Sequence, residues 1–340
     1  MSAQQAAGWT RRRFLGGLTL AGTAGLLGWH PRRAAAEPPP ETMRLRLDQT
    51  GAICVAPQFV AEELLRGEGF TDVQYVKTGG APGTVKAMGA GELDITTTPV
   101  WTSLTHIDAG APMVFLAGLH IGCFELFGTD RIRSIGDLKG KSVAVTVLRS
   151  GRHLFLASMA TYVGLDPRTD IHWVTDPPAV AMRLFAEGQV DAFMGFPPEP
   201  QELRAKQSGH VVVNTTLDRP WSQYFCCMVI GNPEFVRKHP GATKRALRAL
   251  LKANQIYALE PERAARLLVD KGYTKAYEYT LQTLQEIPYS KWREYDPEDT
   301  VRFYALRLQE VGMIQNSPQK IIAQGTDWRF LNELKRELKG

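Results

Sequence analysis

Short apolar runs of strand length alternate with amphipathic helical patterns from residue 44 onward. A third helix is expected to begin with Thr98 as its N-cap and Pro99 in its first turn. The patterns predict strands at residues 44–47, 73–76, 93–96, 113–119 and 124–127, and helices at 57–66 and 85–90. This β-α alternation is typical of an α/β sheet.

The alternation begins again near residue 142. The apolar run 225–230 is strand-like and is expected to lead the chain back to the first part of the fold. Helical patterns then dominate from residue 233, including 243–259 and 301–310. The second cycle predicts strands at 142–146, 171–174, 190–194 and 210–214, and helices at 153–163, 179–187 and 200–207.

One segment of the first cycle resembles a segment of the second. Residues 85–94 and 181–192 each contain a short amphipathic helix, a glycine that ends it, a polar residue, an aliphatic residue and an Asp. The two aspartates, Asp94 and Asp191, stand where a strand is expected to begin. The repeat suggests two similar α/β lobes.

The first 36 residues have the pattern of an export signal. A basic patch at residues 11–13 precedes an apolar run at 14–29, and Ala34-Ala35-Ala36 supplies a small-residue cleavage site. The run of about 16 residues is shorter than the ~20 that a membrane-spanning helix needs. The segment at residues 10–15, Thr-Arg-Arg-Arg-Phe-Leu, resembles the bacterial twin-arginine signal. We therefore expect transit through the twin-arginine translocase to the periplasm; an uncleaved anchor or an ordinary secretory signal is the alternative.

Composition and charge exclude several classes of protein. The 340-residue chain is 44% hydrophobic and 22% charged, which argues against a disordered, collagen-like or coiled-coil protein. Its net charge of +5 comes from the five arginines of residues 1–36; without them the basic residues fall from 40 to 35 and equal the 35 acidic ones. With no basic excess left in the remaining chain, we expect no nucleic-acid partner.

Several segments resemble those of a known family. The run at residues 135–145, which contains Asp-Leu-Lys-Gly-Lys, is the most specific of them. It is joined by residues 87–95, 150–153 and 188–192. On these segments the chain resembles the periplasmic substrate-binding proteins of ABC importers, in the sulfonate, nitrate, taurine and thiamine-precursor branch. The resemblance covers residues 43–335.

This resemblance implies a type II periplasmic-binding-protein fold, an α/β fold whose two lobes are joined by two crossing strands and close on a ligand by hinge motion. The crossings are expected near residues 128–130 and 222–224. Residues 43–129 and 223–340 would then form lobe 1, with a helical C-terminal part, and residues 130–222 would form lobe 2. The expected partners are a membrane permease and its ATPase, and we expect the protein to be a monomer.

Candidate ligand-binding residues follow from position, because ligands of open α/β sheets lie beyond the carboxyl ends of the strands, where helix N-termini favour anions. The strongest candidate is the helix start at residues 149–153, with a hydroxyl, a glycine and two arginines. Glu199 is a candidate for binding an ammonium group. The full predicted set is Thr50, Gly51, Gly80, Thr97, Thr98, Trp101, Ser150, Gly151, Arg152, His153, Phe196, Glu199, Trp221 and Tyr224.

The sequence gives little sign of catalysis or metal binding. It contains no Gly-x-Ser-x-Gly or His-Glu-x-x-His motif. His120 and Cys123 have a metal-ligand spacing, but no second pair follows, so neither a metal nor a cofactor is expected. Cys226 and Cys227 would point to opposite faces of a strand and are interpreted as buried apolar residues. A disulfide between Cys54 and Cys123 remains open.

We therefore predict a solute-binding protein that is not an enzyme and that captures a small anionic or zwitterionic ligand of the sulfonate, nitrate, carboxylate or pyrimidine type. Two alternatives remain. One is an enzyme of the pyrimidine-precursor synthase type on the same fold, and the other is a periplasmic sensor subunit.

Overall fold

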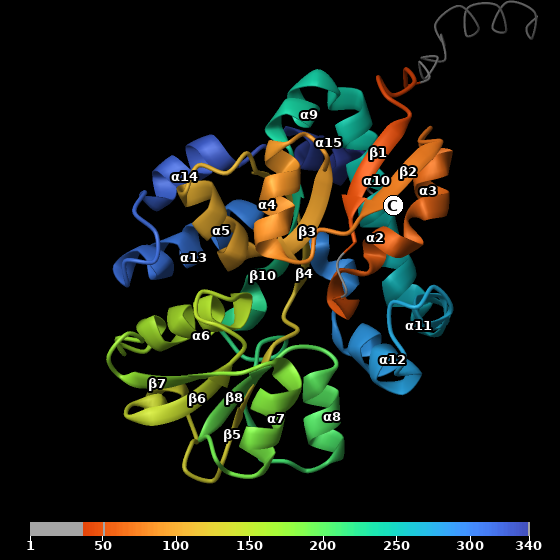
Figure 1. Cartoon of the computed structure of the whole chain (residues 1–340). Coiled ribbons are helices and arrows are strands. Elements are labelled where there is room, and N and C mark those ends of the chain that lie inside the picture. Colours follow the sequence, from red (N-terminus) through yellow and green to blue (C-terminus); the bar gives the residue numbers. More distant parts are fainter. Residues whose placement is uncertain (1–36, 50–51, 339–340) are drawn as a thin grey trace, which may run out of the picture. The chain divides into compact units, whose positions relative to one another are not determined.

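The computed structural model describes residues 37–49 and 52–338. The predicted export signal and the candidate ligand residues Thr50 and Gly51 lie outside this range. The chain forms two five-stranded mixed sheets (Figure 1). Within the described residues, no helix combines the length and the apolar character needed to cross a bilayer.

The first sheet has the strand order β2-β1-β3-β10-β4. Strands β1, β2 and β3 are parallel, and β10 runs antiparallel to both of its neighbours. The strands are β1 (Arg44–Asp48), β2 (Asp72–Val76), β3 (Ile95–Pro99), β4 (Val114–Ile121) and β10 (Phe225–Gly231). The helical segments between them are η1 (Ile53–Val55), α2 (Pro57–Val60), α3 (Glu62–Gly67), α4 (Ala81–Gly89) and α5 (Val100–Asp108).

The second sheet has the order β7-β6-β8-β5-β9, with β5 antiparallel to its two neighbours. Figure 1 shows α6 and α7 beside these strands. The strands are β5 (Glu125–Gly128), β6 (Lys141–Val145), β7 (Ile171–Thr175), β8 (Ala192–Gly195) and β9 (His210–Asn214). The helical segments are η2 (Ile135–Leu138), α6 (Gly151–Tyr162), α7 (Pro178–Ala186), α8 (Glu199–Ala205) and η3 (Trp221–Gln223).

The remaining helices follow β10 and begin mostly with proline, which suits the first turn because its missing N–H would have no partner there. Helix α10 packs on α2, α3 and β4, while α13 packs on α5 and α6. Their bounds are α9 (Pro233–Lys238), α10 (Pro240–Leu259), α11 (Pro261–Asp270), α12 (Tyr277–Glu286), η4 (Tyr289–Arg293), α13 (Pro297–Glu310), α14 (Pro318–Gly325) and α15 (Arg329–Glu337).

The two similar segments seen in the sequence occupy equivalent places. Each lies before the third strand of its sheet in strand order, β3 in the first sheet and β8 in the second. The Asp94 carboxylate accepts the backbone N–H of Arg46 on β1 at 2.8 Å. The Asp191 carboxylate accepts the backbone N–H of Ser142 on β6 at 2.9 Å. The repeated aspartate therefore bonds in the same way to the neighbouring strand, which is second in the order of each sheet.

The expected α/β class and the two-sheet fold are confirmed, but two local predictions are wrong. The chain passes from the first sheet to the second over residues 122–124, before the expected 128–130, because Glu125–Gly128 already pairs with β8 and β9. It returns between β9 and β10, over residues 215–224. Thr98 does not cap α5, because residues 95–99 pair with β10 and Pro99 becomes the N-cap. The lobe boundaries remain a prediction.

Candidate ligand-binding site

A cavity of about 380 Å³ lies where the carboxyl ends of β1 and β3 face the N-terminus of α6. Its size suits a small organic molecule. Residues from both halves of the molecule line it. Most belong to the half built on the first sheet, while Gly151 and Phe196 belong to the half built on the second. The polar lining is Asp48, Gln49, Thr78, Thr84, Thr97, Thr98, Thr102 and His106.

Asp48 carries the negative charge of the cavity and is only 4% exposed. Its carboxylate accepts three threonine hydroxyls: Thr78 at 2.9 Å, Thr84 at 2.8 Å and Thr96 at 3.1 Å. These bonds hold the carboxylate in one orientation at the end of β1. Within the described part of the chain, no lysine or arginine lines the cavity.

Three helices begin at this cavity: α4 after Gly80, α5 after Pro99 and α6 after Ser150. The first N–H groups of a helix have no partner within it and carry partial positive charge, so they bind anionic groups. Gly80 has φ +120°, a backbone conformation that favours glycine over other residues. The cavity therefore offers anion-binding N–H groups together with one carboxylate and several hydroxyls.

Gly151 lets α6 approach α5 closely. A Cβ at this position would lie 3.3 Å from Thr102 Oγ1 and 3.4 Å from Trp101 Nε1. The first distance is tighter than most Cβ contacts and the second is at the lower limit of an ordinary contact, so a side chain at residue 151 would fill the space between the start of α6 and α5.

Of the twelve predicted ligand residues that the structure describes, five line the cavity: Gly80, Thr97, Thr98, Gly151 and Phe196. Trp101 does not, because it is fully buried and stacks on Phe155. Trp221 and Tyr224 are also absent from the lining, because both pack against Phe303.

The predicted residues around the start of α6 mostly interact with one another. Arg152 donates to the Glu199 carboxylate in a bidentate ion pair and to the backbone oxygen of Met194 at 3.1 Å. Ser150 caps α6, since its hydroxyl accepts the backbone N–H of His153 at 3.4 Å. Arg152 and Glu199, interpreted from sequence as contacts to opposite ligand charges, thus neutralise each other outside the cavity lining.

His153 is 6% exposed and its Nδ1 accepts the backbone N–H of Arg149 at 3.1 Å. Burial, aided by the charge of Arg149, lowers the pKa of His153 to about 4. Its ring lies edge-on to Trp173. His153 is therefore neutral at physiological pH and supports the turn that begins α6.

Sequence reasoning missed Asp48, Thr78, Thr84, Thr102 and His106 as lining residues. Asp48 ends β1 just before the candidate Thr50, and Thr78 precedes the candidate Gly80. The position of these residues at the carboxyl ends of parallel strands was a usable signal. Thr102 lies in the first turn of α5 rather than at the end of a strand, so the same signal does not select it.

A second, larger cavity of about 740 Å³ lies among α2, α3, α10 and α11. Its rim is strongly charged, with glutamates and arginines from both helix pairs. It does not lie at the carboxyl ends of the strands, where ligands of α/β sheets bind. The smaller cavity is therefore the better candidate for the ligand site.

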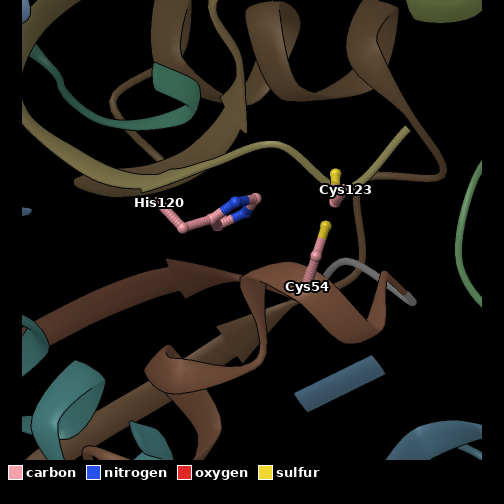
Figure 2. Close-up of side chains that lie close together, drawn as sticks. All are labelled: Cys54, His120 and Cys123. Carbon is pink, nitrogen blue, oxygen red and sulfur yellow. The ribbon is translucent and has the colours of Figure 1, made fainter. Parts of the chain in front are cut away.

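All four cysteines of the chain and His120 gather beside the smaller cavity, and none of the five is more than 6% exposed. Figure 2 shows Cys54, His120 and Cys123, whose ligand atoms all lie within 4.8 Å of one another. We call Cys54, His120, Cys123, Cys226 and Cys227 the cysteine cluster. Its cysteines are free thiols, so the disulfide left open from sequence is not formed in this structure.

The expectation that Cys226 and Cys227 point apart is wrong, since their sulfur atoms lie 3.8 Å from each other. The pairing of β10 with β4 shifts register on both sides of Cys227. Such a bulge breaks the strict alternation of side chains along a strand, so two neighbouring residues turn to one side.

The two-sheet architecture is the periplasmic-binding-protein fold. The fold matches the nitrate-binding protein NrtA of Synechocystis PCC 6803 at a TM-score of 0.72 and 17% identity, covering 89% of this chain and 90% of that one. It matches a sulfonate-binding protein, SsuA, of Methylobacillus flagellatus KT at 0.67 and 18%, covering 87% and 94%. The desulfurization enzyme DSZB also shares the fold, at 0.58 and 16%, covering 86% and 99%.

The chain belongs to the NMT1-like family, whose model matches residues 38–269, more than half of the chain. This membership and the shared fold confirm the resemblance drawn from the sequence segments. No curated protein sequence matches the chain.

Proposed function

We propose that the chain is an extracytoplasmic solute-binding protein that encloses a small zwitterionic or anionic organic molecule and delivers it to an ABC permease. The cavity between the two sheets carries this proposal, because a ligand held by both sides stabilises their closed arrangement. Proteins of the same fold that are named for binding nitrate and sulfonate support a small anionic group on the ligand.

The charges of the cavity favour a zwitterion. Helix N-termini provide N–H groups for an acidic end, while the Asp48 carboxylate attracts an ammonium or another N–H donor. A bare anion would gain the first interaction and suffer repulsion from Asp48. An amino-sulfonate or an amino acid of similar length satisfies both groups.

A pair of matched ligands tests this function. Taurine and ethanesulfonate share the sulfonate and differ in the ammonium group, so calorimetric titration should show tighter binding of taurine by roughly tenfold or more. Asp48→Asn should reduce that preference. A screen that also includes nitrate, carboxylates and pyrimidines, read as a rise in melting temperature, covers the other ligand classes. A protein that binds none of them, or that converts one to a product, would contradict the proposal.

The Thr84 hydroxyl should matter through Asp48. Thr84→Val keeps the shape of the side chain but removes one of three hydroxyl bonds to the carboxylate, and we expect several-fold weaker ligand binding. Thr243→Val is the matched control. Thr243 is also buried, but its hydroxyl donates to the backbone oxygen of His239, away from the cavity.

We also propose export by the twin-arginine route on the basis of residues 10–15. Replacing Arg11 and Arg12 with lysine should leave the uncleaved protein in the cytoplasm. The same chain with Arg32 and Arg33 replaced by lysine should still be exported. Periplasmic fractionation measures both outcomes.

A further inference from the structure

The cysteine cluster brings together residues from three distant parts of the sequence. Cys54 comes from η1, His120 and Cys123 from the end of β4 and the link that follows it, and Cys226 and Cys227 from β10. His120 and Cys227 are direct partners across the β4–β10 ladder, so their side chains lie on the same face. Cys123 has φ +98°, an unusual conformation for a residue with a side chain.

His120 is arranged like a metal ligand. Its Nδ1–H donates a hydrogen bond to the backbone oxygen of Ile121 at 3.2 Å, which fixes the orientation of the ring. Its Nε2 is buried and has no hydrogen-bond partner. A histidine that binds a metal commonly uses one nitrogen for the ion and donates the other N–H to a carbonyl.

The thiols lie at distances that a metal ion would span. The ligand atoms of Cys54, Cys123 and His120 lie mutually within 4.8 Å. Cys227 lies beside this group, opposite His120 in the β4–β10 ladder and lining the same cavity as Cys54. Two thiolates on one tetrahedral zinc ion lie about 3.8 Å apart, given a Zn–S bond of about 2.3 Å. Cys226 is placed differently: its sulfur approaches Cys123 at 3.2 Å and Cys227 at 3.8 Å.

We propose that Cys54, His120, Cys123 and Cys227 form a binding site for a thiophilic metal ion of the Zn²⁺ type. Three thiolates and one imidazole are a common tetrahedral zinc set, and such an ion uses the His120 lone pair that otherwise has no partner. Binding replaces the thiol protons, which leave to solvent, and requires no change of oxidation state.

The site has routes to solvent on two sides. Cys54 and Cys227 line the ligand cavity, and Cys123 lines a separate cavity of about 330 Å³ beside Glu125 and Arg204. An ion can therefore reach the site without unfolding of the surrounding sheet. The same position makes the metal part of the wall of the ligand cavity.

Titration of the full chain with Zn²⁺ and Co²⁺, under reducing and anaerobic conditions and without organic ligand, tests the proposal. We expect one zinc ion per chain, and a cobalt complex with thiolate charge-transfer absorption and the strong visible bands of tetrahedral coordination. Cys54→Ser, His120→Gln and Cys227→Ser should each weaken zinc binding by at least about tenfold. His239→Gln, outside the cluster, and Cys226→Ser should retain it.

A second readout does not depend on how the variants fold. Zinc should protect three of the four cysteines of the unmodified protein from alkylation, as counted by mass spectrometry. Absence of stoichiometric zinc binding, cobalt binding without thiolate bands, or equal alkylation with and without zinc would each overturn the proposal. A protein recovered from the periplasm with a Cys123–Cys226 disulfide and unable to bind zinc after reduction would also overturn it. Ligand binding is measured separately, so failure of one proposal leaves the other intact.

Discussion

Trp101 on α5 and Phe155 on α6 stack face to face, with ring centroids 4.0 Å apart and an angle of 3° between the ring planes. Helix α5 connects strands of the first sheet and α6 connects strands of the second, so this pair joins the two halves of the molecule beside the ligand cavity. Phe124, in the link between the sheets, lies edge-on to both rings. The indole predicted to stack on the ligand is used instead to hold the halves together.

Removal of this stack should destabilise the protein. Trp101→Ala is expected to lower the free energy of unfolding by about 3 kcal/mol, since a large buried ring leaves a cavity. Urea unfolding followed by circular dichroism measures the loss. Trp328→Ala, at a half-buried site near the C-terminus, is the control and should have a smaller effect. An equal loss in both variants would argue against a special role for the stack.

A methyl group at residue 151 should hinder closure of the cavity. In Gly151→Ala the new Cβ lies 3.3 Å from Thr102 Oγ1 and 3.4 Å from Trp101 Nε1, so these side chains or α6 must shift by a few tenths of an ångström beside the cavity. We expect ligand affinity to fall about tenfold, equivalent to ~1.4 kcal/mol. Gly89→Ala, where a Cβ meets nothing within 4 Å, should bind ligand normally. Calorimetry of both variants distinguishes a local steric effect from a general effect of alanine.

The ion pair between Arg152 and Glu199 should contribute to stability rather than to direct ligand contact. Their side chains are only 12% and 15% exposed, so Arg152→Ala leaves a carboxylate nearly buried without its partner. The expected loss is about 3 kcal/mol of unfolding free energy. Adding Glu199→Ala to that variant should cost less than the same change made alone.

Ligand titration of the same variants separates the two roles of Arg152. We expect the affinity of Arg152→Ala to stay within about threefold of the original value. A much larger loss of affinity with unchanged unfolding would instead place Arg152 in contact with the ligand.

Acidification should destabilise the protein through His153. Burial lowers the pKa of His153 to about 4 in the folded state, while the unfolded residue titrates near 6.5. Between these values the unfolded chain binds the extra proton, so stability is full above about pH 6.5 and falls as pH decreases toward 4. The loss at pH 5 is about 2 kcal/mol.

His153→Gln tests this pH dependence, because glutamine can accept a hydrogen bond but does not titrate. Unfolding free energies at pH 7.5 and pH 5 should differ less in this variant than in the unmodified protein. The same pH dependence in both proteins would contradict the assignment to His153.

Local patterns predicted most of the fold because strands and helices here follow the periodicity of the sequence. Asp94 and Asp191 were recognised as equivalent, and they make equivalent bonds to β1 and β6. The rule that ligands lie beyond the carboxyl ends of strands selected Thr97 and Gly151, both of which line the cavity. The patterns behind these predictions lie within short stretches of the chain, although the aspartate bonds themselves join residues 48 and 49 positions apart.

The errors have a common physical cause, which is contact between distant segments. The residues near Arg152 in the sequence do not indicate its ion pair with Glu199. Those near Trp101 do not indicate that its ring stacks on Phe155. The turn of Cys226 and Cys227 to one side depends on a bulge in the pairing of β10 with β4. Alternation along a single strand cannot reveal such a shift.

The strand orders have a consequence for dividing the molecule. The first sheet is interrupted in the sequence: β10 lies between β3 and β4 but follows the whole second sheet, whose strands β5–β9 run continuously from residue 125 to residue 214. A fragment ending at residue 124 would contain four strands of the first sheet with a gap in the middle. It would expose two unpaired strand edges, which favour aggregation. The first half can therefore not be produced as a simple truncation, whereas the second sheet, residues 125–214, is one continuous stretch that can be excised whole.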